Sequence, residues 1–237
     1  MDIKSDNSRQ SILVVGASRG LGLAMAAEFA SKGWFVVGTV RESGHTALHD
    51  LADAHAEHIA IEPLDITRSD EIKALGERLV GRAFDMLFVN AGTANRDQNE
   101  TIAQTTTDEF VRVMLTNALG VMRTVEGLQN LVRPAGLIGV MSSGQGSIAN
   151  NTKGGNEVYR GSKAALNQFM RSYAARTSHD QRAKVLMAPG WIRTELGGPD
   201  ATFSVQETIP QVVETLLAQQ GKPGLRFIDR HGATVPW

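Results

Sequence analysis

The sequence predicts an α/β protein: a single doubly wound Rossmann-like domain with a mostly parallel seven-stranded sheet. Three observations lead to this class. Short apolar, β-branched runs alternate with longer stretches that carry apolar residues at helical spacing. The candidate strands are apolar throughout, as expected of strands that helices cover on both faces of a sheet. The first candidate strand leads into a Gly-rich turn and then directly into a helix.

The order of the elements follows from this alternation. The expected strands are residues 11–15, 34–40, 58–62, 84–90, 136–142, 184–188 and 226–229. The expected helices are residues 21–31, 46–56, 69–81, 107–131, 158–176 and 205–219. Because no linker or internal repeat interrupts the pattern, we expect residues 11–237 to form one dinucleotide-binding and catalytic domain. The polar residues 1–10 are expected to form a flexible N-terminal tail.

Composition narrows the class of partner. The 237 residues carry a formal net charge of −1, without the basic stripe of a nucleic-acid-binding protein. No apolar run reaches the ~18 residues needed to span a bilayer. The lack of cysteine removes thiol catalysis and thiolate metal sites, and none of the six histidines has metal-ligand spacing. We therefore expect a cytoplasmic protein that binds a small molecule, without metal, nucleic acid or membrane.

The turn after the first strand has the composition of a phosphate-binding loop. It reads Gly16-Ala17-Ser18-Arg19-Gly20-Leu21-Gly22 and opens into a helix. Glycine permits the tight turn and the close approach of a pyrophosphate, which the N–H groups and the dipole of the helix N-terminus attract. The position between the first strand and first helix favours a dinucleotide over a Gly-rich turn without a ligand.

The spacing G-x-x-x-G-x-G resembles the fingerprint of the short-chain dehydrogenase/reductase family, T-G-x-x-x-G-x-G. Val15 replaces the usual Thr, so one supporting hydrogen bond of the loop is in question. The resemblance covers about residues 11–230, with every motif in family order. It implies that the loop residues bind a nicotinamide cofactor: Gly16, Ser18, Arg19, Gly20, Leu21 and Gly22.

The end of the second strand distinguishes NADP from NAD. An NAD enzyme needs an acidic side chain there, about 20 residues after the loop, but this chain has Val40. Arg41 follows it, and with Arg19 it would hold a 2′-phosphate through bidentate hydrogen bonds. Glu42 leaves the alternative open, because a small loop shift would aim it at the ribose. NADP(H) is favoured and NAD(H) remains possible.

Two further segments match the family pattern. In Leu64-Asp65-Ile66, the resemblance implies that Asp65 accepts a hydrogen bond from the adenine amino group, with Ile66 beside it. An Asp that simply starts the next helical turn is an equally open interpretation. After the fourth strand, Asn90-Ala91-Gly92 would stabilise the sheet and line the adenine ribose.

Tyr159 and Lys163 stand at i and i+4 on one face of a predicted helix. A phenol with a pKa near 10 transfers protons poorly at neutral pH unless a cation stabilises the phenolate. An ammonium one turn away supplies that cation. The resemblance makes Tyr159 the general acid and base, with both residues also contacting the cofactor.

By the same resemblance, a Ser at the end of the fifth strand stabilises negative charge on the substrate oxygen. Ser143 is the preferred candidate, with Ser142 as the alternative. Asn117, locally unfavourable inside a helix, would distort the helix and hold a water against the catalytic Lys.

The segment Pro189-Gly190-Trp191-Ile192-Arg193-Thr194 follows the sixth strand. In the family this turn wraps the nicotinamide, which implies cofactor contacts for Pro189, Gly190, Ile192 and Thr194. Trp191 has two open interpretations, a core side chain or a wall of the substrate pocket. Gln145, in the loop between residues 143 and 158, is a further candidate substrate contact.

The residues 159–167 and the ending Pro236-Trp237 resemble the C-factor/sniffer branch of carbonyl reductases. The expected activity is NADP(H)-dependent interconversion of a carbonyl and an alcohol, in either direction. A dinucleotide-binding regulatory or signalling protein with little turnover is the alternative. Family members often pair through the helices expected at 107–131 and 158–176, which implies a homodimer or homotetramer.

Overall fold

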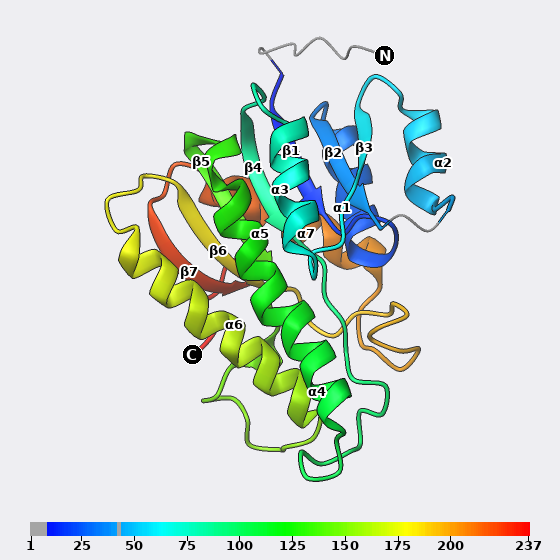
Figure 1. The fold of residues 1–237 in the computed structure, drawn as a ribbon, viewed down its shortest axis with the longest axis vertical. Helices are drawn as coiled ribbons and strands as arrows, with labels where there is room; N and C mark the ends of the chain where they lie inside the picture. The colour runs from blue at the N-terminus through cyan, green and yellow to red at the C-terminus, as the bar shows by residue number, and fades with distance from the viewer. Residues whose placement is uncertain (1–8, 42–43) are drawn as a thin grey trace.

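Seven parallel strands form one sheet in the order β3-β2-β1-β4-β5-β6-β7 (Figure 1). This computed structural model describes residues 9–41 and 44–237. The strands are β1 (Ser11–Val15), β2 (Phe35–Val40), β3 (Ile59–Pro63), β4 (Phe84–Val89), β5 (Val132–Met141), β6 (Ala183–Ala188) and β7 (Gly224–Asp229). The predicted doubly wound Rossmann-like fold is confirmed, and all six strand pairs are parallel.

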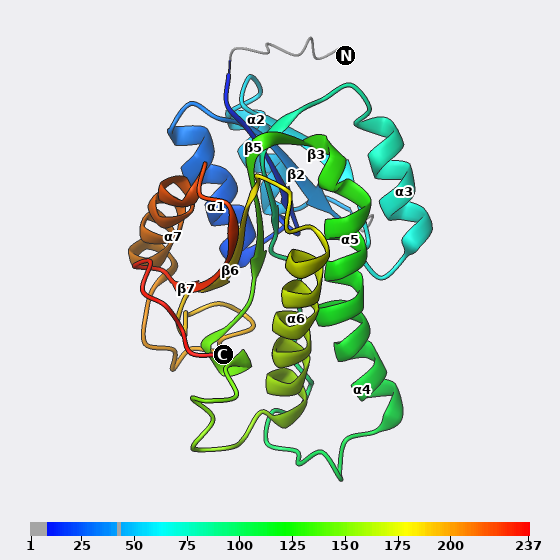
Figure 2. The same cartoon turned by 90° about the vertical axis from the view of Figure 1, so that its left-hand side faces the viewer.

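Helices cover both faces of the sheet (Figure 2). The helices are α1 (Gly20–Ser31), α2 (Ala47–Ala54), α3 (Ser69–Arg78), α4 (Thr107–Met114), α5 (Val121–Leu128), α6 (Glu157–Arg176) and α7 (Val205–Gln219). One core cluster joins the sheet to α3, α5 and α6, and the other joins it to α1, α2 and α7. Leu13 of β1 belongs to the first cluster and Ile12 to the second, because successive strand residues point to opposite faces. This explains why the strands are apolar throughout.

The helix predicted over residues 107–131 is divided into four parts. After α4, the chain forms a π-helix over Leu115–Gly120, continues as α5 and ends in a 3₁₀ turn over Gln129–Leu131. The wide turn contains Asn117, whose side chain bonds groups outside the helix. Hydrophobic spacing alone predicts a continuous helix, because a single π-helical turn shifts the apolar pattern too little to be recognised.

Strand β5 begins at Val132, four residues before the predicted start at Gly136. The sequence Pro134-Ala135-Gly136 is typical of a turn, which explains the late prediction. In the structure these residues form a bulge, because Val132 pairs with Phe84 whereas Leu137 pairs with Met86. The bulge accommodates Pro134, which has no N–H to give to a ladder.

The flexible tail predicted for residues 1–10 falls mostly on residues 1–8, which lie outside the described residues, as does Glu42. The single-domain assignment of residues 11–237 remains a prediction. In the part of the chain that the structure describes, no helix is long and apolar enough to cross a membrane.

Candidate active site

The predicted motifs lie at the carboxyl edge of the sheet, in the loops after β1, β4, β5 and β6. Strand order reverses between β1 and β4, and the crevice beyond that point is where open α/β sheets bind ligands. The loops that follow these two strands contain Gly16 and Asn90, and the Asn90 amide donates to the Gly16 carbonyl over 2.8 Å.

Two glycines of the first loop are required by its geometry. Gly16 has φ +84°, in the left-handed region that disfavours other residues, and a Cβ there would lie 2.8 Å from Cα of Ala91. A Cβ on Gly22 would lie 2.0 Å from the carbonyl oxygen of Gly16. The loop is therefore folded back tightly on the N-terminus of α1, as a phosphate cradle requires.

Thr39 supports the glycine loop from the neighbouring strand. The Gly16 N–H donates to Thr39 Oγ1 over 2.9 Å, and the Ala17 N–H donates to the Thr39 carbonyl over the same distance. Thr39 is a buried residue of the neighbouring strand β2. The loop, which has Val15 where the family has Thr, is thus held by a hydroxyl 23 positions after Gly16.

The N-terminus of α1 suits an anion. Its N-cap residue, Arg19, makes no side-chain cap, and the first turn of the helix holds no acidic residue. The N–H groups and dipole of this turn therefore meet no competing carboxylate from the helix's own first turn. Thr194, in the segment after β6, approaches the same place, since a Cβ on Gly20 would lie 3.9 Å from Thr194 Cγ2. The residues present fit a dinucleotide phosphate.

The residues expected to hold the adenosine end are placed as follows. Arg19 pairs with Glu195 over 3.0 Å, with both side chains mostly exposed. Arg41 lies exposed just beyond β2. Asp65 uses Oδ1 to accept from the N–H and the hydroxyl of Thr67, at 2.8 and 2.7 Å, in a local turn. Asp65 thus closes a local turn ahead of α3, which begins at Ser69, and adenine recognition remains a prediction.

Tyr159 and Ser143 meet where β5 ends and α6 begins. Burial raises the pKa of the Tyr159 phenol, and the nearby Ser143 side chain opposes that rise. The N–H of Gln145 donates to Ser143 Oγ over 3.1 Å, which leaves the Ser143 proton for another acceptor. This pair can present two O–H donors to one substrate oxygen.

Lys163 lies one turn further along α6. Its Nζ is 5.8 Å from the centre of the Tyr159 ring and donates to the Met141 carbonyl over 2.9 Å. Burial lowers the pKa of the Lys163 ammonium to about 8. Gly92 packs beside it, because a Cβ there would lie 3.5 Å from Lys163 Nζ. The predicted Tyr–Lys pair is therefore assembled next to the segment after β4.

Asn117 joins the same group from the π-helix. Its Oδ1 accepts from the Thr93 N–H over 2.8 Å, and its Nδ2 donates to the Thr93 carbonyl and to Ser162 Oγ, at 2.7 and 2.9 Å. The side chain is buried and connects the segment after β4 to the residue that precedes Lys163. The expected distortion of the helix is present, whereas the water proposed beside Lys163 remains a prediction.

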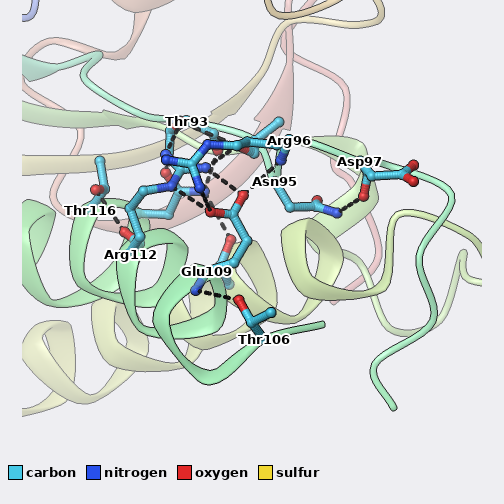
Figure 3. A network of polar contacts seen from close by, with 11 residues as sticks. Thr93, Asn95, Arg96, Asp97, Thr106, Glu109, Arg112 and Thr116 are labelled. Atoms are coloured by element: carbon cyan, nitrogen blue, oxygen red, sulfur yellow. Dashed lines mark hydrogen bonds and ion pairs between the residues drawn. The ribbon is translucent and has the colours of Figure 1, made fainter. Parts of the chain in front are cut away.

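A buried carboxylate fixes the Thr93 segment (Figure 3). Arg112 of α4 donates to both oxygens of Glu109 over 2.8 Å each, to Thr93 Oγ1 over 2.9 Å and to the Ala94 carbonyl over 2.8 Å. The hydrogen bonds from Arg112 hold the pKa of Glu109 at about 2. Sequence reasoning missed this network, because an acidic residue in the first turn of a helix is common for other reasons.

The two serine candidates have different surroundings. Ser142 is buried and its hydroxyl donates to Asn167 Oδ1 over 2.6 Å. Ser143 is partly exposed, and its side chain is near enough to Tyr159 to oppose the rise in the phenol pKa. The geometry therefore favours Ser143 as the substrate-facing hydroxyl. Gln145 is partly buried, and its Oε1 accepts a 3.4 Å bond from Asn156.

The segment after β6, residues 189–194, lies at the same edge of the sheet as the other motifs. Gly190 has φ +105°, and a Cβ there would lie 2.7 Å from the Arg230 guanidinium. Trp191 is 52% exposed and donates its indole N–H to the Gly197 carbonyl over 2.8 Å. It is therefore a surface side chain held against its own loop, and the core interpretation of Trp191 is wrong.

These residues define a dinucleotide-binding oxidoreductase with a Rossmann-like fold. The chain belongs to the short chain dehydrogenase family, whose model matches residues 10–203. It is similar to a structure from Burkholderia multivorans described as a short-chain dehydrogenase/reductase with bound NADP, at 60% identity and TM-score 0.96. That match covers 97% of this chain and all of the other.

Other relatives place the chain near the predicted branch. It is 34% identical to C-signal of Myxococcus xanthus over 54% of this chain and 79% of that protein. It is 31% identical to 1-hydroxy-2-glutathionyl-2-methyl-3-butene dehydrogenase of Rhodococcus sp. (strain AD45), over 95% of this chain and 99% of that protein. The structure of carbonyl reductase Sniffer of D. melanogaster is 27% identical, with TM-score 0.88, and the match covers 97% of this chain and 100% of that one. The resemblance to the C-factor/sniffer branch is confirmed.

Proposed function

We propose that this protein is an NADP(H)-dependent reductase that interconverts a ketone or aldehyde and an alcohol. The observation that carries the proposal is the assembly of Ser143, Tyr159 and Lys163 beside the segment after β4, which also packs against the glycine loop. When bound, the nicotinamide supplies or accepts the hydride. The chain's own residues then handle the proton: Tyr159 donates to the carbonyl oxygen during reduction, or accepts from the alcohol during oxidation.

Two neighbours of Tyr159 support that role. Ser143 donates a second hydrogen bond to the oxygen on which negative charge develops. Lys163 stabilises the phenolate, because an ammonium at this distance favours the charged form of the phenol. Asn117 holds the segment after β4 beside them.

The glycine loop and the turn after β6 would hold the cofactor. Gly16–Gly22 and the α1 N-terminus would bind the pyrophosphate, Arg19 and Arg41 the 2′-phosphate, and Pro189–Thr194 the nicotinamide. The NADP in the Burkholderia multivorans structure supports this choice over NAD. The remaining proposed contacts are Asp65, Ile66 and residues 90–92.

The Tyr159→Phe variant tests the function. We expect it to abolish NADPH oxidation across a panel of carbonyls, because the proton donor is lost, while NADPH binding measured by cofactor fluorescence is retained. Wild-type protein serves as the control in both assays. Near-normal turnover by the variant would contradict the proposal.

A regulatory protein with little turnover is a second candidate. The similarity to C-signal favours it, since that name denotes signalling. Turnover of any carbonyl or alcohol by wild-type protein, measured with both cofactors, separates the two functions.

We also propose that the protein forms a homodimer or homotetramer in the cytoplasm. Large apolar side chains are exposed on the two helical segments expected to pair: Phe110, Val111, Leu119 and Phe169. Both views show α4 and α6 side by side (Figures 1 and 2). A second copy of the chain would cover this surface. The proposed cytoplasmic location is a separate point, which cell fractionation tests.

A further inference from the structure

Asn167 occupies the helix face that also carries Tyr159 and Lys163. The three residues are spaced by four along α6, so their side chains lie one above the other. Asn167 is 3% exposed, and the proton transfer described above does not use it. A polar side chain buried this deeply needs partners, and both of its partners belong to the turn around Ser143.

The Asn167 amide bonds both ends of that turn. Its Oδ1 accepts from the Ser142 hydroxyl over 2.6 Å, and its Nδ2 donates to the Gly146 carbonyl over 3.2 Å. The turn is closed by the Gly146 N–H, which donates to the Ser143 carbonyl over 2.9 Å. Ser143 is thus enclosed between two residues that the same amide holds.

The turn also packs directly on the helix backbone. A Cβ on Gly146 would lie 2.9 Å from Lys163 Cβ and 3.0 Å from the Lys163 carbonyl carbon. On the strand side, Lys163 Nζ bonds the Met141 carbonyl, and the Ser142 N–H donates to Met187 of β6. The backbone before and after Ser143 is therefore attached to the helix that carries Tyr159.

We propose that Asn167 is a positioning residue for the reaction: it fixes the distance between the Ser143 hydroxyl and the Tyr159 phenol. This inference rests on the proposed carbonyl reduction. A catalytic hydroxyl displaced by about 1 Å can cost about 100-fold in rate, so an amide that holds it affects turnover without touching the substrate.

The experiment compares Asn167→Ala and Ser142→Ala in wild-type and Ser143→Ala backgrounds. Gln168→Ala, which shortens the exposed amide next along α6, is the matched control. In the wild-type background we expect Asn167→Ala to lower kcat by about 10- to 100-fold, with KM for NADPH changed less than about twofold. Ser142→Ala, which removes one of the two bonds, should lower kcat by a smaller factor in the same direction.

In the Ser143→Ala background, Asn167→Ala should add less than about a twofold loss, because the group it positions is already absent. Hydrogen exchange of cofactor-free protein gives a readout that does not depend on turnover. Amides of residues 143–147 should exchange faster in Asn167→Ala than in Gln168→Ala.

An equal loss of kcat in both Ser143 backgrounds would overturn the positioning role, and so would unchanged kcat in Asn167→Ala. If Asn167→Ala does not fold, Ser142→Ala undergoes the same comparison, with the same outcomes. Failure of wild-type protein to turn over any carbonyl or alcohol would instead overturn the proposed function, and this inference with it.

Discussion

At the residue scale, the burial of Lys163, which serves the proposed reaction, has a cost in stability. Burial lowers the pKa of its ammonium from 10.5 to about 8, so at neutral pH the folded protein holds a desolvated charge. Between about pH 8 and 10.5 the unfolded chain binds a proton that the folded chain does not, and stability therefore rises with pH over this range.

We expect Lys163→Met to stabilise the cofactor-free protein at pH 7 by about 1–3 kcal/mol, since the buried charge is removed. Loss of the Met141 hydrogen bond offsets part of the gain. Thermal unfolding measured from pH 7 to 10 should show the gain shrinking as pH rises, while activity is lost throughout. A lower Tm than wild type at pH 7 would contradict this reasoning.

Arg41 carries the prediction of cofactor preference. Arg41→Ala should raise KM for NADPH selectively, with little change in KM for NADH, because only NADPH has a 2′-phosphate for a guanidinium to bind. Lys73→Ala removes an exposed cation from α3 and is the control. Steady-state kinetics with both cofactors decide the matter: equal changes in the two KM values would argue against a phosphate contact.

At the scale of elements, α4 secures the loop after β4 through Glu109. The hydrogen bonds from Arg112 hold the pKa of this carboxyl at about 2, below its ordinary 4.5. The stabilisation is therefore complete above about pH 4.5 and is lost as pH falls toward 2.

Glu109→Gln should destabilise the protein by about 1–3 kcal/mol at pH 7, because the hydrogen bonds from Arg112 lose their buried, ionised acceptor. It should also flatten the dependence of Tm on pH between 4.5 and 2. Glu77→Gln, on the exposed surface of α3, is the matched control. If Tm falls equally with pH between 4.5 and 2 in both variants, Glu109 is not the group whose protonation destabilises the protein.

The elements also show what a sequence can and cannot predict. Tyr159 and Lys163 were predictable because helical spacing alone brings them together, and the glycine loop because it joins two adjacent elements. Other contacts were not predictable, because they join residues far apart in the chain and no sequence pattern indicates them. These are the bonds of Thr39 to Gly16, of Asn167 to Ser142 and of Arg112 to Thr93. The bulge in β5 was missed because Pro134 and Gly136 are typical of turns.

At the scale of the whole molecule, the exposed apolar residues of α4, the π-helix and α6 predict self-association. Sedimentation should detect species of twice or four times the 25.5 kDa chain mass. Phe169→Glu should shift them toward monomer, because a charge in an apolar interface is costly. Ile148→Glu changes a side chain that is 76% exposed elsewhere, and it should leave the assembly unchanged. Wild-type protein sedimenting only as monomer would contradict the prediction.

The attachment of the Ser143 turn to α6 has a consequence for how new substrate ranges arise. Residues 142–146 are fixed to the helix, whereas residues 148–155 are exposed. Gly154 and Gly155, with the following Asn156, adopt left-handed backbone. If the proposed function holds, insertions, deletions or grafts in this outer half should therefore change the approach to the site without displacing the hydroxyls of Ser143 and Tyr159. Loop exchange at residues 148–155 is accordingly the place to begin directed evolution of this enzyme's selectivity.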